Sequence, residues 1–220
     1  MNDEKIIRVV LAEDHVVVRQ GLSALLDADG HFQVVGEATT GREAVQMAQQ
    51  FHPDIILMDI AMPVLNGLEA MRQILSVNPA AKVIILSAHS EDEYIQRAHN
   101  AGAAGFIEKQ ISTKALIKAI REVATGNPFF SPLSDGQGDF PPAPRVQEPR
   151  LTRREAEVLQ LVAGGSANKQ IAATLGVSIK TVEKHRHQLM AKLDIHDIAG
   201  LTRYALSIGV VGLRPPSKTT

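Results

Sequence analysis

Short apolar runs alternate with longer amphipathic segments through the first 125 residues of the chain. Five runs rich in aliphatic residues predict strands at Ile6–Ala12, Phe32–Ala38, Asp54–Asp59, Lys82–Ser87 and Gly105–Glu108. The segments beside them place aliphatic residues at helical spacing, at Val17–Ala28, Gly41–Gln50, Gly67–Val77, Glu91–Ala101 and Thr113–Thr125. Five strands that alternate with five helices predict a doubly wound α/β domain, in which a parallel sheet is covered on both faces.

The pattern breaks between residues 126 and 149. This stretch holds six of the eleven prolines of the chain and few aliphatic residues. Because such a composition cannot bury a core, it predicts a partly extended linker between a domain at residues 1–125 and another at residues 150–220. Three aromatic residues in the linker, Phe129, Phe130 and Phe140, are candidates for packing it onto a domain surface.

The apolar pattern of residues 150–220 is helical throughout. A helix over Asn168–Leu175 and a longer one, which Ser178 caps and which ends at Leu193, flank a turn at Gly176. Two helices joined by a tight turn that contains glycine predict a helix-turn-helix. The remaining predicted helices are one that starts with a capping box at Thr152 and Glu155 and one over Ile198–Ile208.

Charge divides the chain at the same places. Residues 1–125 hold 11 Lys and Arg against 16 Asp and Glu, residues 126–149 hold 1 against 3, and residues 150–220 hold 11 against 5. The formal charges are therefore −5, −2 and +6, within a total of −1. A basic end on an acidic chain favours a polyanionic partner such as nucleic acid, and the alternative is a charge split with no partner.

The composition also excludes several classes of protein. The chain has no cysteine, which excludes disulfides and thiolate metal sites and favours a reducing compartment. No apolar run approaches the roughly 18 residues that span a bilayer, and the start Met1–Glu4 lacks the basic residues of a signal peptide. We therefore expect a cytoplasmic protein with no membrane partner.

Polar residues stand at the carboxyl ends of four predicted strands, where open parallel sheets bind their ligands. They are Glu13 and Asp14 after the first strand, Asp59 at the end of the third, Ser87 at the end of the fourth and Lys109 after the fifth. Clustered carboxylates repel, and ligands that are all oxygen favour a hard ion such as Mg²⁺. Lys109 and Ser87 can then hold an anion, which predicts a phosphoryl group on the nucleophile Asp59.

Each of these residues also has a simpler interpretation. Asp14 can cap the following helix, Lys109 can be a solvated surface charge, and Ser87 can bond to amides of its own loop. The joint placement of all five at strand ends favours the site.

With these residues in view, the first 125 residues resemble a response-regulator receiver domain, which has a flavodoxin-like fold. The resemblance implies that a sensor histidine kinase phosphorylates Asp59 and that Mg²⁺ is bound by Asp14, Asp59 and the Ala61 carbonyl, with Glu13 acting through water. It also implies that Ser87 and Lys109 grip the phosphoryl oxygens while Phe106 changes position as a switch.

Three residues depart from the usual receiver pattern. Glu13 stands where aspartate is common, Phe106 where tyrosine is common, and Gln110 where many receivers have proline. Phe106 has no hydroxyl, so its part of the switch must rely on packing alone.

The helix that follows Ser178 separates an apolar side from a polar one. Lys180, Glu183, Lys184 and His187 can reach outward, as expected of a helix that enters the major groove, and the alternative is a solvated helix of a small bundle. Residues Leu151–Val211 resemble a LuxR-type DNA-binding domain through Leu151-Thr152-x-Arg154-Glu155, Asn168-Lys169-x-Ile171-Ala172, Leu175-Gly176-Val177-Ser178, Thr181-Val182-x-x-His185 and Lys192-Leu193.

That second resemblance implies a role for each polar residue. Base edges are read by Glu183, Lys184 and His187, whereas phosphates are contacted by Lys169, Lys180 and Thr181. The helix over Ile198–Ile208 resembles the dimerisation helix of the family.

The order of the two domains is similar to that of NarL/FixJ-type response regulators. We therefore expect a transcription factor that phosphorylation of Asp59 switches, and no enzymatic activity beyond its own phosphoryl transfer and dephosphorylation. The expected partners are a sensor histidine kinase, double-stranded DNA and a second copy of the chain, with RNA polymerase as a further candidate. One alternative is a DNA-binding regulator that is never phosphorylated. The other, an aspartyl-phosphate phosphatase, is disfavoured because Ala61 stands where such enzymes carry a second aspartate.

Overall fold

The chain forms two compact units, Met1–Arg145 and Val146–Thr220. The computed structural model describes residues 6–88, 92–131, 151–207 and 210. We call the described part of the first the sheet unit and that of the second the helical unit. Among these residues, no helix is both long enough and apolar enough to cross a membrane.

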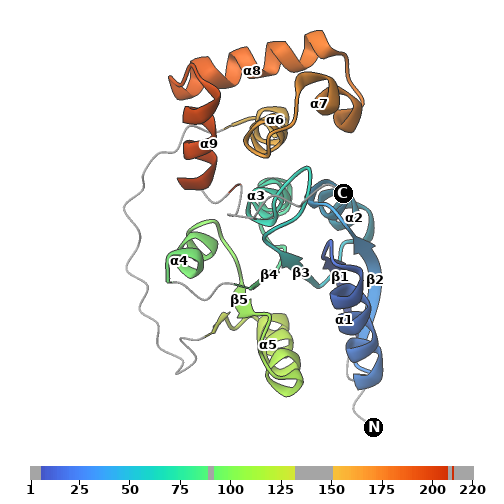
Figure 1. The fold of residues 1–220 in the computed structure, drawn as a ribbon. Helices are drawn as coiled ribbons and strands as arrows, with labels where there is room; N and C mark the ends of the chain where they lie inside the picture. The colour runs from blue at the N-terminus through green and yellow to red at the C-terminus, as the bar shows by residue number, and fades with distance from the viewer. Residues whose placement is uncertain (1–5, 89–91, 132–150, 208–209, 211–220) are drawn as a thin grey trace. The chain divides into compact units, whose positions relative to one another are not determined.

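The sheet unit is built on a six-stranded parallel sheet in the order β2-β1-β3-β4-β5-β6 (Figure 1). Its strands are β1 (Ile7–Ala12), β2 (Phe32–Ala38), β3 (Ile55–Asp59), β4 (Val83–Ser87), β5 (Gly105–Glu108) and β6 (Phe129–Phe130). Its helices are α1 (Val16–Asp29), α2 (Gly41–Phe51), α3 (Gly67–Val77), α4 (Asp92–Asn100) and α5 (Thr113–Thr125). The neighbours of β1 are β2 on one side and β3 on the other, so the topological switch point lies at the carboxyl end of β1.

Helices cover both faces of the sheet. Leu26 of α1 and Ile120 of α5 pack against Leu11, Leu57 and Ile107 in one continuous buried cluster. In Figure 1, α2, α3 and α4 lie on the opposite side of the sheet from α1 and α5. With apolar residues required on both faces, β3 and β4 are buried along their whole length. The predicted α/β fold is therefore confirmed.

The predicted strands and helices agree with the observed ones to within about one residue at each end, and the difference is β6. Phe129 and Phe130, which lie in the predicted linker, pair with Gly105 and Phe106 of β5. The sheet thus has six strands where five were predicted, because two residues are too short a run to show a periodicity. The prediction that both phenylalanines pack onto a domain is confirmed, whereas Phe140 lies outside the described residues.

The helical unit contains α6 (Arg153–Ala163), α7 (Asn168–Leu175), α8 (Ile179–Leu193) and α9 (Ile198–Ser207). The predicted capping box at Thr152 and Glu155 is present, and the Ser178 hydroxyl accepts the Thr181 amide at the start of α8. Gly176 ends α7 with φ of 65°, a left-handed conformation that glycine adopts without steric cost and that sets up the tight turn into α8. The predicted helix-turn-helix is therefore present.

Candidate functional site

The carboxyl ends of β1, β3 and β5 bring Glu13, Asp59 and Lys109 together at one edge of the sheet. The Lys109 Nζ lies 2.7 Å from Glu13 Oε2 and 3.0 Å from Asp59 Oδ1. Both acids are buried, with exposed fractions of 0% and 2%. Buried carboxylates need compensating charge, and Lys109 supplies one positive charge for the two acids. The cluster therefore carries negative charge that a further cation could balance.

Asp59 carries the clearest electrostatic perturbation at this edge. Burial raises the pKa of its carboxyl above the ordinary value, and the neighbouring Glu13 adds to the rise, although Lys109 and the Ala61 amide oppose it. Asp59 Oδ2 is buried and has no hydrogen-bond partner among the described residues. Since buried polar atoms are normally partnered, this oxygen marks the position where a cation or a reacting group can add.

Lys109 is held in place through both its side chain and its backbone. Burial alone would lower the pKa of its ammonium, but the contacts with Glu13 and Asp59 outweigh that effect and raise the pKa. The Lys109 amide also donates to the Ser87 carbonyl at 2.7 Å, which joins the ends of β4 and β5. Ser87 itself is 2% exposed. The predicted lysine and serine thus stand on adjacent strand ends beside the acids, and the lysine is not a solvated surface charge.

The loop after Asp59 folds back against the end of β3. The amides of Met62 and Gly67 both donate to the Ile60 carbonyl, at 3.1 and 2.9 Å. A Cβ at Gly67 would lie 2.0 Å from the Asp59 carbonyl oxygen, so only glycine permits this approach. The loop thereby fixes the backbone of Asp59, and it presents the exposed Ala61 next to the carboxylate.

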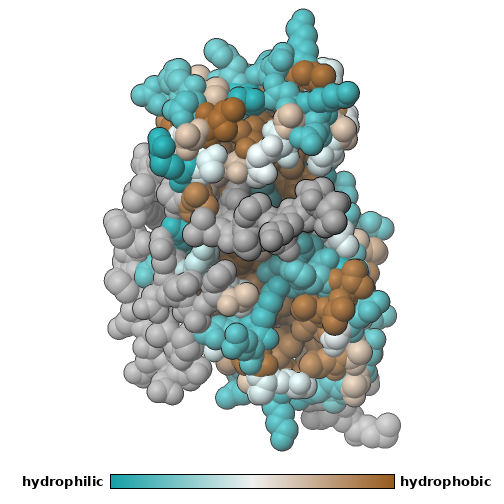
Figure 2. Space-filling model, viewed as in Figure 1, coloured by the Kyte–Doolittle hydropathy of each residue, from teal (hydrophilic) through white to brown (hydrophobic). Residues whose placement is uncertain are grey.

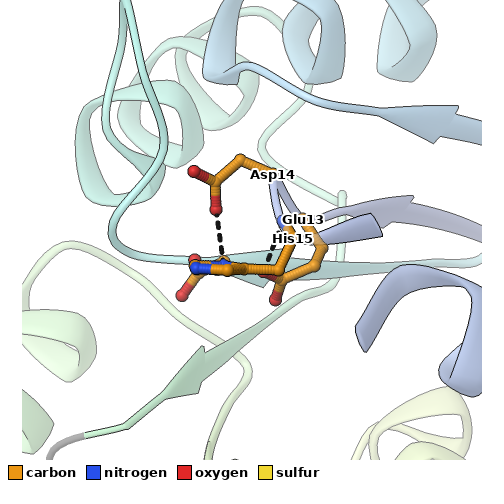
Figure 3. A group of neighbouring side chains, drawn as sticks. Glu13, Asp14 and His15 are labelled. Carbon is orange, nitrogen blue, oxygen red and sulfur yellow. Dashed lines mark hydrogen bonds and ion pairs between the residues drawn. The ribbon is translucent and has the colours of Figure 1, made fainter. Parts of the chain in front are cut away.

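His15 belongs to the same edge although the sequence pattern gave no reason to select it. Its Nδ1 lies 2.9 Å from Glu13 Oε1 and 2.9 Å from Asp14 Oδ1 (Figure 3). One candidate ligand atom from each of Glu13, Asp14, His15 and Asp59 lies within 4.8 Å of the others. The available signal was adjacency, because His15 directly follows the acidic pair. His15, and not Asp14, occupies the N-cap position of α1.

Two further features of α1 border this edge. Arg19 donates to the Glu13 carbonyl at 2.8 Å and so ties α1 to the end of β1. Three consecutive valines begin the helix, with exposed fractions of 54%, 82% and 37% for Val16, Val17 and Val18. Figure 2 shows hydrophobic surface in this part of the sheet unit. The acidic edge is thus bordered by an apolar surface that a protein partner can cover.

In the helical unit, α8 buries one side and exposes the other. Val182 and Leu189 are fully buried. The exposed residues on the opposite side include the predicted Lys180, Glu183, Lys184 and His187, together with Gln188, which the sequence pattern did not select. Because they extend over the outer side of the helix, they form a polar face that can enter a groove of DNA.

The two other predicted phosphate contacts of the helical unit lie near the start of their helices. Lys169 is exposed in the first turn of α7. Thr181 is half-buried in α8, and its hydroxyl lies 2.8 Å from that of Ser178. Arg186 of α8 donates to Asn168 Oδ1 at 2.7 Å, which holds the start of α7 against α8.

Comparison with known proteins follows this division of the chain. The family described as response regulator receiver domain matches residues 9–121, and the family described as bacterial regulatory proteins, luxR family, matches residues 149–205. The transcriptional regulatory protein MctR of Rhizobium johnstonii is 40% identical over 96% of this chain and 98% of its own length. The chain is a LuxR-family response regulator.

The sheet unit is thus the receiver domain of this response regulator, and the helical unit is its LuxR-type DNA-binding domain. The response regulator protein VraR of Staphylococcus aureus is also similar, with 35% identity over 93% of this chain and 99% of its own. A solved structure of two RcsB dimers bound to two parallel DNAs is 24% identical over 91% of this chain and 98% of that one, with a TM-score of 0.54. That likeness shows the fold. The relatives are regulators of transcription and not enzymes.

The structure brings six of the seven predicted receiver residues to one edge, Ala61 among them beside Asp59, and leaves one away from it. Glu13, Asp14, Asp59 and Lys109 are in contact or within a few ångströms, and Ser87 stands on the neighbouring strand end. Phe106 is fully buried in β5, where it pairs with Ile85 on one side and Phe130 on the other. The predicted DNA-binding residues all belong to the other unit.

Proposed function

We propose that this response regulator is a transcription factor whose affinity for DNA is switched by phosphorylation of Asp59. The observation that carries the proposal is the buried Asp59 carboxylate, with Lys109 on one oxygen and, within the part of the chain that the structure describes, no hydrogen-bond partner on the other. Such an oxygen can attack phosphorus without first breaking a protein contact. As the bond from Asp59 to phosphorus forms, the phosphorus–nitrogen bond of a phosphohistidine in the kinase breaks and the imidazole leaves.

The residues around Asp59 fit a magnesium ion. The cluster offers carboxylates with a surplus of negative charge, and one of its buried oxygens has no partner. Asp14, Asp59 and the Ala61 carbonyl would hold the ion, and Glu13 would act through water. When bound, Mg²⁺ supplies positive charge that stabilises the developing charge on the phosphoryl oxygens.

Lys109 and Ser87 are proposed to hold the phosphoryl group. The raised pKa of Lys109 keeps its ammonium charged, so it can follow the negative charge from Asp59 to the phosphoryl oxygens. Ser87 stands on the strand end joined to Lys109 and supplies a hydroxyl that can donate to the same group.

The signal is proposed to leave the receiver domain through β5. Phe106 lies in this strand, and Phe129 and Phe130, near the start of the predicted linker, pair with it as β6. The amide of Ser131 donates to the Phe106 carbonyl at 2.9 Å. A rearrangement around Phe106 therefore reaches the start of the linker directly, and phosphorylation shifts an equilibrium between two arrangements of this region.

In the DNA-binding domain, α8 is proposed to enter the major groove. Glu183, Lys184 and His187 would contact base edges, and Lys169, Lys180 and Thr181 would contact phosphates. A second copy would pair through α9, so that two domains read a roughly palindromic site. We place the protein in the cytoplasm, with a sensor histidine kinase and RNA polymerase as its protein partners.

Phosphorylation is tested with acetyl phosphate and Mg²⁺ followed by intact mass. We expect one phosphoryl adduct on the wild type and none on Asp59→Asn. Asp54→Asn is the matched control, because Asp54 directly precedes β3, at the opposite end from Asp59, and its carboxylate accepts the Arg8 amide at 2.9 Å. That variant should keep the adduct. No adduct on the wild type, or an adduct on Asp59→Asn, would refute the proposed switch.

DNA recognition is tested on an operator selected by the wild-type protein. Lys184→Ala and His187→Ala should each lose about 1–3 kcal/mol of binding free energy and relax the preference at one base pair. Lys180→Ala should weaken all sequences equally and lower the salt slope by about one. Lys118→Ala, an exposed lysine of α5, serves as the control. Full retention of affinity and preference by both α8 variants would rule out α8 as the reading helix.

The route from the switch to DNA is tested by ultracentrifugation of the phosphorylated chain. Pairing of phosphorylated receiver domains predicts a dimer without DNA, whereas release of the DNA-binding domain predicts a monomer with raised affinity.

A further inference from the structure

His15 stands at a helix start but does not cap the helix. It occupies the N-cap position of α1 and its side chain makes no capping hydrogen bond, although residues at this position usually accept an amide of the first turn. The imidazole instead turns back over the acidic pair, where Nδ1 meets one oxygen of Glu13 and one of Asp14 (Figure 3). The ring nitrogen thus lies close to two carboxylate oxygens, whose negative charge favours a cation at this position.

The distances in this group match the spacing of ligands around one metal ion. Two ligands that each lie about 2.1 Å from an ion are about 3.0 Å apart at a right angle and about 3.4 Å apart at the tetrahedral angle of zinc. The Nδ1 of His15 lies 2.9 Å from Glu13 Oε1 and 2.9 Å from Asp14 Oδ1. A ligand atom of Asp59 lies within 4.8 Å of the ligand atoms of the other three residues. Because two ligands of one ion lie at most about 4.2 Å apart, metal binding would draw these side chains slightly closer together.

A second observation concerns Asp59, which belongs to the same group. Asp59 is 2% exposed and its Oδ2 has no hydrogen-bond partner among the described residues. The His15 side chain is 51% exposed, so its ring is accessible to a metal ion from solvent. Magnesium selects oxygen ligands, whereas Zn²⁺, Ni²⁺ and Cu²⁺ favour an imidazole nitrogen.

We propose that His15 is a metal ligand of this response regulator and that it adapts the acidic edge to borderline transition ions such as Zn²⁺. Glu13 or Asp14, Asp59 and the His15 Nδ1 together offer two carboxylates and one imidazole. Carboxylate oxygens and an imidazole nitrogen are all zinc ligands, and three protein ligands leave one position of a zinc ion open. The inference rests on the proposed metal site at Asp14 and Asp59, and it adds a ligand that Mg²⁺ does not need. Zinc and magnesium then compete for one site.

The experiment is calorimetric titration of the full chain with Zn²⁺ and, separately, with Mg²⁺. The matched control is His31→Ala, because His31 also contacts an aspartate, with its Nδ1 3.1 Å from Asp29 Oδ1. In that pair, however, Arg121 already lies 2.8 Å from the same oxygen. We expect His15→Ala to weaken Zn²⁺ binding at least about tenfold and Mg²⁺ binding less than about twofold, and His31→Ala to change neither.

A nitrogen-detected spectrum of the histidine rings gives a readout independent of affinity. The Nδ1 resonance of His15 is identified by its absence in His15→Ala. One equivalent of Zn²⁺ should give it the shift of a metal-bound nitrogen, whereas one equivalent of Mg²⁺ should not. Equal loss of affinity for both ions in His15→Ala, or unchanged Zn²⁺ binding, would refute the ligand role. Failure of the wild type to bind Mg²⁺ would instead count against the proposed function, and the zinc comparison would still be readable.

Discussion

Both domains bury a pair of acidic side chains, and the two pairs differ in their partners. In the receiver domain, Asp59 shares the ammonium of Lys109 with Glu13, which also accepts from the His15 amide at 3.1 Å. Asp59 Oδ2 has no hydrogen-bond partner among the described residues. In the DNA-binding domain, Glu155 and Glu157 are 4% and 0% exposed, yet each has several donors. Burial alone therefore does not distinguish a structural acid from a reactive one.

The partners of the second pair explain its different electrostatics. Glu155 accepts from Lys192 at 2.6 Å and from the Thr152 amide at 2.7 Å, while Glu157 pairs with Arg154 at 2.9 Å. Although burial opposes it, this set of donors lowers the pKa of Glu155, whereas the pKa of Asp59 is raised. An acid with a full set of donors stabilises the fold, and one that lacks them is available for chemistry.

The largest expected effect comes from Lys109→Ala. It leaves Glu13 and Asp59 buried without a counter-charge, which should cost the receiver domain about 3–5 kcal/mol of unfolding free energy. Hydrogen exchange of receiver peptides in urea measures it separately from the other domain. The double variant Lys109→Ala with Asp59→Asn should recover part of the loss. If Lys109→Ala lost little unfolding free energy, other groups would already balance the charge of Glu13 and Asp59. The contrast with the acidic pair of the DNA-binding domain would then be wrong.

Glu155→Ala should have the next largest effect, confined to the DNA-binding domain. It removes the ion pair with Lys192 and the reciprocal bond of the capping box, which together should cost about 1.5–3 kcal/mol. Glu183→Ala, at an exposed position of α8, should stay within about 0.5 kcal/mol. Amide hydrogen exchange of peptides from residues 151–207 measures the loss of stability in both variants. Equal effects at the two positions would contradict the assignment of Glu155 as structural.

The smallest expected effect is the pH dependence of the free energy of unfolding, and its sign should differ between the two domains. The pKa of Asp59 in the folded protein is raised above its ordinary value of 3.8. Its favourable contribution to the free energy of unfolding is therefore complete below pH 3.8 and is lost as the pH rises through the folded pKa. Asp59→Asn should therefore be more stable than wild type at pH 7, by a margin that shrinks toward pH 4. The measurement uses metal-free buffers with EDTA, so that metal binding at Asp59 does not contribute to the difference in stability.

Glu155 should show the opposite dependence. Its folded pKa is lowered from 4.5, so its contribution is present above that pH and is lost as pH falls through the folded value. Hydrogen exchange between pH 7 and pH 4 should follow both domains in one sample. The same sign of change for Asp59→Asn and Glu155→Gln would remove the proposed contrast.

The sequence was sufficient for the fold and for most of the candidate site because both follow from local rules. Apolar periodicity located the strands and helices, and parallel topology then required that Asp59 and Lys109 meet at one edge. The capping box at Thr152 and the outward polar residues of α8 were readable for the same reason, since each depends on spacing within one element.

Tertiary structure alone decided which charges are satisfied and where short segments pack. No periodicity could reveal that Glu155 meets Lys192, which lies 37 positions away, or that two phenylalanines add a sixth strand. The position of the His15 ring over the acidic pair was equally hidden, because a side-chain rotamer depends on its surroundings. Local pattern determined the elements of this protein, and long-range contacts determined the chemical state of the residues that those elements bring together.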